Sequence, residues 1–215
     1  MSGPSGAPSR ATYRHGDLRS ALLEAGMELA GDGGPDAVVL REATRRAGVS
    51  PNAAYRHFAD RQALLAAVSD AAQSRAADAM EEEMQRAAHG ADADAAARAH
   101  ARLRAVGTGY LRFARAEPGL FRAAFSVPTA LGTSDSPAKA GSGGRTPYQL
   151  LSDALDALAA AGELPPDRRS HAEFLAWSSV HGLATLMIDG PLRGLPPQLV
   201  AGVEQRLLDM VAKGL

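Results

Sequence analysis

Cysteine is absent from the 215-residue chain, which excludes disulfides, thiolate catalysis and cysteine-based zinc sites. Aromatic residues make up only 5% of the sequence, and alanine, the residue with the highest helix propensity, fills many apolar positions instead. No stretch approaches the roughly 20 apolar residues of a membrane span, and the polar N-terminus lacks the apolar segment of a signal peptide. We therefore expect a cytoplasmic, helix-rich protein with no membrane partner.

A strong charge of either sign is also missing. The formal net charge is −1 and the pI is about 6.6. Up to residue 65, eight arginines stand against seven acidic residues, so even the N-terminal part is only weakly basic. A nucleic-acid site in this protein therefore depends on where its arginines are placed, and not on bulk charge.

Apolar residues recur with a helical period along most of the sequence, and glycine and proline mark where each helix is expected to stop. No segment shows a convincing strand pattern, so the predicted fold is all-α. The length allows one large domain, or a small domain joined to a larger one. The roughly nine predicted helices cover residues 15–30, 39–47, 51–58, 60–89, 92–116, 117–126, 148–161, 165–190 and 196–215.

The segment from residue 127 to residue 147, VPTALGTSDSPAKAGSGGRTP, is rich in glycine, serine, proline and threonine. It is long for an internal connection, and such segments are usually either mobile or functional. Its composition predicts that it is mobile and tolerates shortening.

The stretch RRAGVSPNAAYRHF, residues 45–58, carries the signals for a helix, a tight turn and a second helix. Gly48 lies where the first helix must stop, because glycine adopts a positive φ at little cost. Ser50 can cap the next helix through its hydroxyl, and Pro51 suits the first helical position. Residues 39–58 are therefore predicted to form a helix-turn-helix.

The second helix of this unit has two chemically different faces. Ala54 and Phe58 are spaced to join the core, whereas Asn52, Tyr55 and Arg56 form the opposite stripe. Asparagine can pair with an adenine edge, arginine with guanine or phosphate, and a tyrosine hydroxyl with phosphate. This chemistry suits DNA, but a helical hairpin with a solvated face fits the periodicity equally well.

Residues 40–68, LREATRRAGVSPNAAYRHFADRQALLAAV, closely resemble the DNA-binding segment of the TetR family of transcriptional regulators. The likeness rests on GVS at 48–50, YRHF at 55–58, Arg61 and the leucines at 64–65. The resemblance implies a three-helix DNA-binding unit. The predicted DNA-binding residues, those implied by the resemblance together with Ser50, are Arg41, Ser50, Pro51, Asn52, Ala53, Tyr55, Arg56, His57 and Arg61.

The segment departs from the family pattern in three places. Val39 stands where a serine or threonine usually caps the first helix of the helix-turn-helix, and Ala43-Thr44 replaces a bulky aliphatic residue followed by alanine. These two changes are expected to loosen the DNA-binding unit. Arg61 replaces the commoner lysine, which conserves the charge and a phosphate contact.

The C-terminal part offers a weaker resemblance. WSSVHG, residues 177–182, looks like the Trp-x3-His-Gly signature of one branch of the family. The indole and imidazole can line a ligand pocket, or Trp177 can belong to the core and His181 be a structural histidine; both interpretations remain open. The predicted pocket residues are Tyr110, Phe113, Phe174, Trp177 and His181.

The prediction is a homodimeric regulator, most simply a ligand-released repressor, acting on a palindromic operator in double-stranded DNA and answering to an unknown small-molecule effector. Residues 1–12 would form a disordered arm, 13–65 the DNA-binding domain, and 66–215 the ligand-binding and dimerisation domain. The last two long helices would form the dimer interface, because the final helix carries more apolar residues than a lone terminal helix needs: Leu199, Val203, Leu207, Met210 and Val211.

The alternative is a helical-bundle carrier or enzyme in which the helix-turn-helix is incidental. The sequence shows no H-E-x-x-H pattern, no Glu-x-x-His pair and no phosphate-cradling glycine loop. His100, His171 and His181 could bind a metal only if the fold brought them together. We therefore expect no catalytic site, no metal and no cofactor.

Overall fold

The computed structural model describes residues 15–88, 94–128 and 135–215, and this part is helical, without a strand. The predicted arm, residues 1–12, lies outside the described residues. Two short 3-10 helices, η1 (Pro35–Ala37) and η3 (Pro137–Lys139), lie in the connections. The all-α prediction is confirmed. The α-helices are α1 (His15–Gly33), α2 (Leu40–Arg46), α3 (Pro51–Tyr55), α4 (Arg61–Ala88), α5 (Ala95–Ala116), α6 (Pro118–Ala124), α7 (Pro147–Ala160), α8 (Pro166–Arg169), α9 (Ala172–Ile188) and α10 (Pro197–Gly214).

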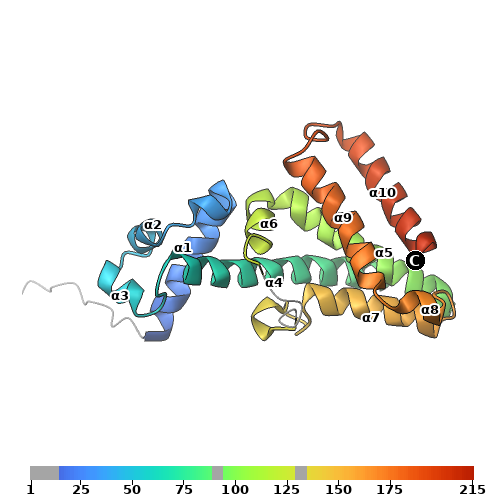
Figure 1. The fold of residues 1–215 in the computed structure, drawn as a ribbon, viewed down its shortest axis with the longest axis horizontal. Coiled ribbons are helices and arrows are strands. Elements are labelled where there is room, and N and C mark those ends of the chain that lie inside the picture. Colours follow the sequence, from blue (N-terminus) through green and yellow to red (C-terminus); the bar gives the residue numbers. More distant parts are fainter. Residues whose placement is uncertain (1–14, 89–93, 129–134) are drawn as a thin grey trace, which may run out of the picture.

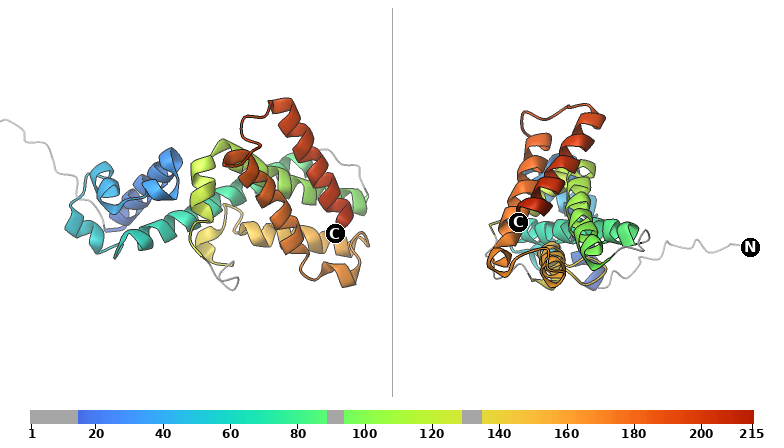
Figure 2. Two further views of the ribbon diagram at one scale, coloured as in Figure 1. Left: turned by 45° about the horizontal axis from the view of Figure 1, so that its top comes forward. Right: turned by 90° about the vertical axis from the view of Figure 1, so that its right-hand side faces the viewer.

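Helices α1, α2 and α3 form a small group at one end of an elongated molecule, and α4 runs from this group along the rest of it (Figure 1). The bundle of α5 to α10 surrounds the distal part of α4, with α9 and α10 standing out together on one side (Figure 2). The predicted boundary between residues 65 and 66 falls inside α4. One continuous helix therefore belongs to both parts of the molecule.

The predicted helix over residues 165–190 is wrong in one respect, because the structure divides it into α8 and α9. Ser170 has an extended backbone, and His171 has a φ of 65°. A histidine in this left-handed region is uncommon, because its Cβ crowds the backbone, and sequence pattern gives no warning of it. The described residues consequently contain ten α-helices where about nine were predicted.

Glycines permit two close crossings that fix the bundle. A Cβ on Gly109 of α5 would lie 2.4 Å from the Cα of Met80, so α5 passes directly over the backbone of α4. A Cβ on Gly119 of α6 would lie 2.3 Å from the carbonyl oxygen of Ala30 and 2.4 Å from that of Gly31. The start of α6 therefore abuts the last turns of α1, which belongs to the N-terminal group.

The described part of the long connection before α7 is packed, contrary to the predicted mobility. The Ser74 hydroxyl on α4 donates to the carbonyl oxygen of Ala140 at 2.7 Å, and the Asp78 carboxylate accepts from the backbone N–H of Ser142 at 2.7 Å. The Glu81 carboxylate accepts from the next N–H, on Gly143, at 2.9 Å. These hydrogen bonds from α4 side chains fix the part of the connection that follows η3. Residues 129–134 of the predicted loop lie outside the described residues.

Candidate nucleic-acid interface and ligand cavity

The turn between α2 and α3 forms as the sequence predicts. Gly48 has a φ of 66°, and its N–H donates to the carbonyl oxygen of Arg45 at 3.3 Å. The N–H of Val49 donates to the carbonyl oxygen of Thr44 at 3.0 Å. This pair of bonds is the Schellman arrangement, which satisfies the last carbonyls of a helix and reverses the chain direction.

Helix α3 begins with the predicted cap. The Ser50 hydroxyl accepts a hydrogen bond from the backbone N–H of Ala53 at 3.4 Å, and Pro51 occupies the first helical turn. Proline has no N–H to leave unsatisfied there, and its φ matches the helix. These two residues set the direction in which the short helix leaves the turn.

The two predicted faces of α3 are also observed. Ala54 and Phe58 are buried, while Val49 is half-buried beside them. The side chain of Tyr55 is 57% exposed, so its ring and hydroxyl are open to a partner. Of the predicted DNA-binding residues, Arg41, Ser50, Pro51, Asn52, Tyr55, Arg56 and Arg61 are exposed, and Ala53 and His57 are half-buried.

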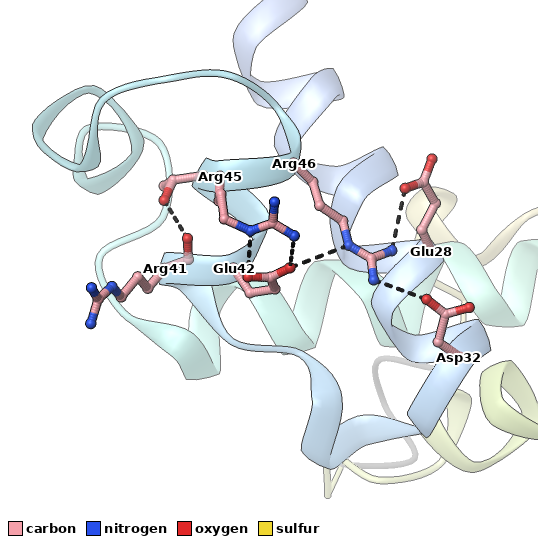
Figure 3. A network of polar contacts seen from close by, with 7 residues as sticks. Glu28, Asp32, Arg41, Glu42, Arg45 and Arg46 are labelled. Atoms are coloured by element: carbon pink, nitrogen blue, oxygen red, sulfur yellow. Dashed lines mark hydrogen bonds and ion pairs between the residues drawn. The ribbon is translucent and has the colours of Figure 1, made fainter.

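The arginines of α2 do not all face the same way (Figure 3). Arg46 reaches α1, with guanidinium nitrogens 2.9 Å from Asp32 and 3.5 Å from Glu28. Arg45 binds Glu42 on its own helix, and the hydrogen bond from Arg45 is the main reason why the pKa of Glu42 lies below its usual value. The guanidinium of Arg41 points away from this network and forms no ion pair within the described residues, so its charge remains available to a partner.

Arg61, which is predicted to contact DNA, also has hydrogen-bond partners within the protein. Its Nε donates to the carbonyl oxygen of Val38 at 2.8 Å, and a terminal nitrogen donates to that of Pro35 at 2.7 Å. The guanidinium thus ties the start of α4 to the connection between α1 and α2. The planar guanidinium of arginine presents five donors in a fixed fork and can bind two carbonyls at once. The compact ammonium group of lysine has three donors and suits this arrangement less well.

The two remaining departures from the family pattern are visible in α2. Val39 precedes the helix and its side chain caps nothing. Thr44 is buried, and its hydroxyl donates to the carbonyl oxygen of Arg41 at 2.6 Å, which satisfies the polar group that replaces an apolar one. The helix therefore lacks a side-chain cap at its start, while its buried hydroxyl is not left unpaired.

A cavity of about 550 Å³ lies within the bundle of α4 to α10. Four of the five predicted pocket residues line it: Tyr110, Phe174, Trp177 and His181. Phe113 does not, and that assignment is wrong: its side chain is buried against Phe121, with the ring centroids 6.5 Å apart. Phe113 lies on the same side of α5 as Tyr110 but nearly one turn further along the helix, beside Phe121.

Three polar side chains of the cavity wall form a chain of hydrogen bonds. The indole N–H of Trp177 donates to the hydroxyl oxygen of Tyr110 at 3.1 Å. The Tyr110 oxygen lies 2.8 Å from His181 Nδ1. Since a hydroxyl has only one proton to give, Tyr110 can donate it to Nδ1 if His181 is neutral and carries its own proton on Nε2.

Burial reinforces this protonation pattern. It lowers the pKa of His181 and raises that of Tyr110, so both side chains stay uncharged at neutral pH. The rings of Phe121 and Phe125 pack against His181, with centroids 5.2 Å and 5.0 Å away. The cavity therefore offers a ligand an aromatic wall and a neutral imidazole. Trp177 and His181 both pack and line the cavity, so the two interpretations of the sequence were not exclusive.

Sequence reasoning missed the lining residues that come from α4, from the long connection and from the start of α7. Gln73, Lys139 and Tyr148 line the cavity together with apolar neighbours. No local pattern marks them, because they meet only when the connection folds onto α4. The one available signal was the length of the connection, which also fitted a functional segment.

The histidines do not gather into a metal site. His100 lies 3.0 Å from the Glu163 carboxylate, and His171 stacks on the ring of Phe174. Within residues 15–88, 94–128 and 135–215, no group of three or more metal-binding side chains is found. Among the same residues, no helix combines the length and apolar character that crossing a membrane requires.

A helix-turn-helix with an exposed recognition helix, joined to a bundle that encloses a cavity, defines a one-component DNA-binding regulator. The family model of bacterial regulatory proteins of the tetR family matches residues 22–68, and that of the tetracyclin repressor-like C-terminal domain matches residues 103–211. The chain therefore belongs to the TetR family of transcriptional regulators. Members of this family are DNA-binding transcription factors and not enzymes, which sets aside the alternative of an enzyme.

Solved structures agree with this assignment. A protein of unknown function from Rhodococcus sp. RHA1 shares 31% identity, with a TM-score of 0.71 over 96% of this chain and 99% of that one. The TetR family regulator PfmR from Thermus thermophilus has 18% identity and a TM-score of 0.56, over 92% and 96% of the two chains. A TetR family regulator from Chloroflexus aurantiacus has 18% identity and a TM-score of 0.51, over 93% of each. The last two show the fold alone. A search of curated proteins gave no match.

Proposed function

We propose that this regulator is a ligand-released repressor, and that α6 couples its cavity to its DNA-binding part. Ala124 at the end of α6 and the adjacent Phe125 line the cavity, while Gly119 at the start of α6 abuts the carbonyls of α1. A ligand that displaces Phe125 therefore acts on the same short helix that supports α1. This contact between α6 and α1 carries the proposal.

The proposed mechanism is a population shift. Two recognition helices must lie about 34 Å apart to enter successive major grooves. A ligand that binds better when this spacing is different weakens DNA binding by its differential affinity for the two states. Residues 13–65 would then be the DNA-binding domain and residues 66–215 the effector and dimerisation domain.

On α3 we assign base recognition to Asn52 and phosphate contact to Ser50 and Tyr55. Arg41 and Arg56 are exposed, and neither forms an ion pair within the described part of the chain, so both would meet phosphate or guanine. Pro51, Ala53 and His57 would allow close approach at the edges of this surface. Arg61 is left out of the contact set, because two of its donors already bind backbone carbonyls.

The proposed dimer interface is the outer face of α9 and α10. Leu175, Leu186, Leu199 and Met210 are large apolar side chains exposed on these two helices. A Cβ added to Gly182 would meet no atom within 4 Å beyond its own stretch of helix, so the space beside this residue is open. A second helix could approach closely there, as in a bundle of two helices from each protomer.

We also assign the chain to the Trp-His-Gly branch of the family. The support is that Trp177 and His181 meet through Tyr110 in the cavity wall while Gly182 leaves a gap on the outer face of α9. One helix would thus present its signature residues to ligand on one side and to the partner protomer on the other.

The DNA-binding proposal is tested by selecting sequences from a random duplex library with the purified protein. A palindromic consensus is expected, and Asn52→Ala should weaken binding to it by about 1–3 kcal/mol while relaxing preference at one position in each half-site. Binding to random DNA should not change. Arg41→Gln should instead weaken both and flatten the log–log salt dependence by about one unit per subunit. An asymmetric consensus, or no effect of Asn52→Ala, would contradict the assignment.

The dimer proposal is tested by the mass in solution. Wild type should have about twice the chain mass of 22.3 kDa, and Leu186→Glu should reduce it to that of a single chain, because a buried unpaired charge opposes association. Val39→Glu is the matched control, since both side chains are 43% exposed and Val39 lies far from α9 in the N-terminal group. A dimer that survives Leu186→Glu would place the interface elsewhere.

A further inference from the structure

The chain has only two lysines among 23 lysines and arginines, and they lie in opposite surroundings. Lys213 is exposed in the last turn of α10, whereas Lys139 is only 3% exposed and lines the cavity. Lysine is almost never fully buried unless its ammonium group is paired. The partner of the buried Lys139 ammonium therefore bears on what the cavity can bind.

Within the described residues, the ammonium of Lys139 has one distant counter-charge. The Nζ atom lies 3.9 Å from Oδ1 of Asp70 on α4, which is beyond hydrogen-bond range. The Asp70 side chain is about one-third exposed, so water screens its charge, while that of Lys139 is buried. Burial raises the pKa of Asp70, and the attraction of Lys139 only partly opposes this. An ammonium group with three donors is thus left with a weak partner.

Lys139 is also held in place. It ends η3, and the residues that follow it are fixed to α4 by the Ser74, Asp78 and Glu81 side chains. The backbone at Lys139 therefore cannot easily carry the ammonium out to solvent. Its position against the cavity is a built feature of the fold.

The rest of the cavity wall is apolar or neutral. Leu103, Val106, Leu151 and Val180 contribute apolar surface, and the polar chain around Tyr110 is uncharged. The other cation on the wall, Arg104, is neutralised by Asp209. Two cationic side chains, Arg104 and Lys139, are among the described residues that line the cavity. Of these two, Lys139 is the one without a carboxylate in direct contact.

We propose that the effector is an amphipathic anion, with an apolar body that fills the cavity and one acidic group, such as a carboxylate, that accepts hydrogen bonds from Lys139. This inference rests on the proposed role of the cavity as the effector site. An ionised acceptor would complete the hydrogen bonding of the buried ammonium, and charge-assisted bonds of this kind are stronger than neutral ones. A neutral ligand of the same shape would not supply an ionised acceptor to the Lys139 ammonium.

Two fluorescent probes that differ by one charge test the proposal with the full-length protein. 8-Anilinonaphthalene-1-sulfonate carries a sulfonate on the ring system that it shares with uncharged N-phenyl-1-naphthylamine. Trp177 is the only tryptophan of the chain and lines the cavity, so energy transfer from Trp177 to a bound probe reports occupancy of this site.

Lys139→Met, which keeps the apolar stem, should weaken binding of the sulfonate probe by about tenfold to a hundredfold and leave the neutral probe unchanged. Lys213→Met removes the other lysine and should change neither. Asp70→Asn removes a competing negative charge and should strengthen binding of the sulfonate probe alone. Asp70→Asn tests the anion proposal even if Lys139→Met fails to fold.

The outcomes separate this inference from the proposed function. If both probes bind but Lys139→Met affects them equally, or Asp70→Asn leaves the sulfonate probe unaffected, the anion proposal is wrong and the cavity remains an effector site. If neither probe receives energy from Trp177 in the wild-type protein, the assignment of the cavity as a ligand site is wrong as well.

Discussion

The polar groups near the recognition helix and those around the cavity work in different surroundings. Arg45 and Arg46 form their ion pairs at the surface of α1 and α2, whereas Tyr110, Trp177 and His181 bond to one another inside the bundle. An exposed ion pair contributes about 0.2–1 kcal/mol and weakens with salt. Removing one partner of a buried hydrogen bond leaves the other unsatisfied and costs about 1–3 kcal/mol.

Replacing an exposed residue near the recognition helix is therefore expected to change function without changing stability. Replacing a residue of the cavity wall is expected to change both. Exposed residues such as Asn52 and Arg41, which we propose to contact DNA, are expected to tolerate replacement with little effect on the fold. The cavity wall offers no such freedom, because the side chains that would recognise the effector also satisfy one another. Sequence changes that alter effector choice are therefore expected to alter stability too.

The largest effect is expected at the junction of the two regions. Gly119→Ala would force a methyl group to within 2.3 Å of the Ala30 carbonyl oxygen, a backbone atom that cannot easily move. We expect the free energy of unfolding to fall by about 1–3 kcal/mol in urea denaturation at fixed protein concentration. Any remaining response of DNA binding to ligand should be reduced as well.

Gly31→Ala is the control for this junction. Gly31 is exposed in α1 with φ in the ordinary range and no atom near its Cβ position, so the change should stabilise the protein by about 0.5–1 kcal/mol. Equal stability of Gly119→Ala and wild type would show that α1 and α6 can separate without cost, and the proposed coupling would lose its basis.

A pair of tyrosine variants tests the comparison directly. Tyr110→Phe removes the hydroxyl between Trp177 and His181 and should cost about 1–3 kcal/mol of unfolding free energy, because two partly buried groups lose their partner. Tyr55→Phe removes an identical hydroxyl from an exposed site and should leave stability unchanged while weakening DNA binding. If the two variants lost the same stability, the contrast between the regions would not hold.

The features that the sequence predicted are those set by neighbours in the chain. Gly48, Ser50 and Pro51 act within a few residues, so their turn and cap could be read from spacing, and the faces of α3 followed from helical period. His181 and Trp177 were placed for the same reason, since one helical turn separates them. The residues beyond this range were missed or misplaced because their partners are remote.

Arg61 and Lys139 show how distance in the chain defeats prediction. Arg61 bonds to carbonyls 23 and 26 residues earlier, and the segment after Lys139 is held by α4 side chains more than 60 residues before it. Neither contact follows from a local pattern. The left-handed backbone of His171, which divides the predicted penultimate helix, is likewise not marked by any local sequence pattern.

Arginine variants give the next effect in size. Arg61→Gln removes the hydrogen bonds to two backbone carbonyls. The free energy of unfolding should fall by about 1 kcal/mol, and not more, because the Arg61 side chain is partly exposed. The salt dependence of DNA binding should change little. Arg41→Gln should do the reverse, flattening the salt dependence and leaving stability alone. A flattened salt slope for Arg61→Gln would restore it to the phosphate contacts.

The smallest effect is expected from pH, and it belongs to the cavity region. Burial lowers the pKa of His181 from its ordinary value of 6.5, so the unfolded chain binds a proton there more readily than the folded one. Stability should therefore fall as pH decreases through about 6.5 toward the lower folded value, and recover as pH rises. Protonation would also oblige Nδ1 to donate, which leaves the Tyr110 hydroxyl proton without its acceptor.

His181→Gln isolates this contribution, because its amide oxygen can accept from Tyr110 and does not titrate. The half-buried carboxyls Asp70 and Glu204, whose pKa values burial raises, stabilise the fold as pH falls, and they are common to both proteins. Melting temperatures of the two proteins should thus run parallel above pH 7 and separate as the pH falls below about 6.5, with wild type losing more. Parallel curves throughout that range would mean that the imidazole is as well solvated in the cavity as in the unfolded chain. The cavity would then resemble the DNA-facing surface in its tolerance of charge, and the contrast between the two regions would rest on hydrogen bonding alone.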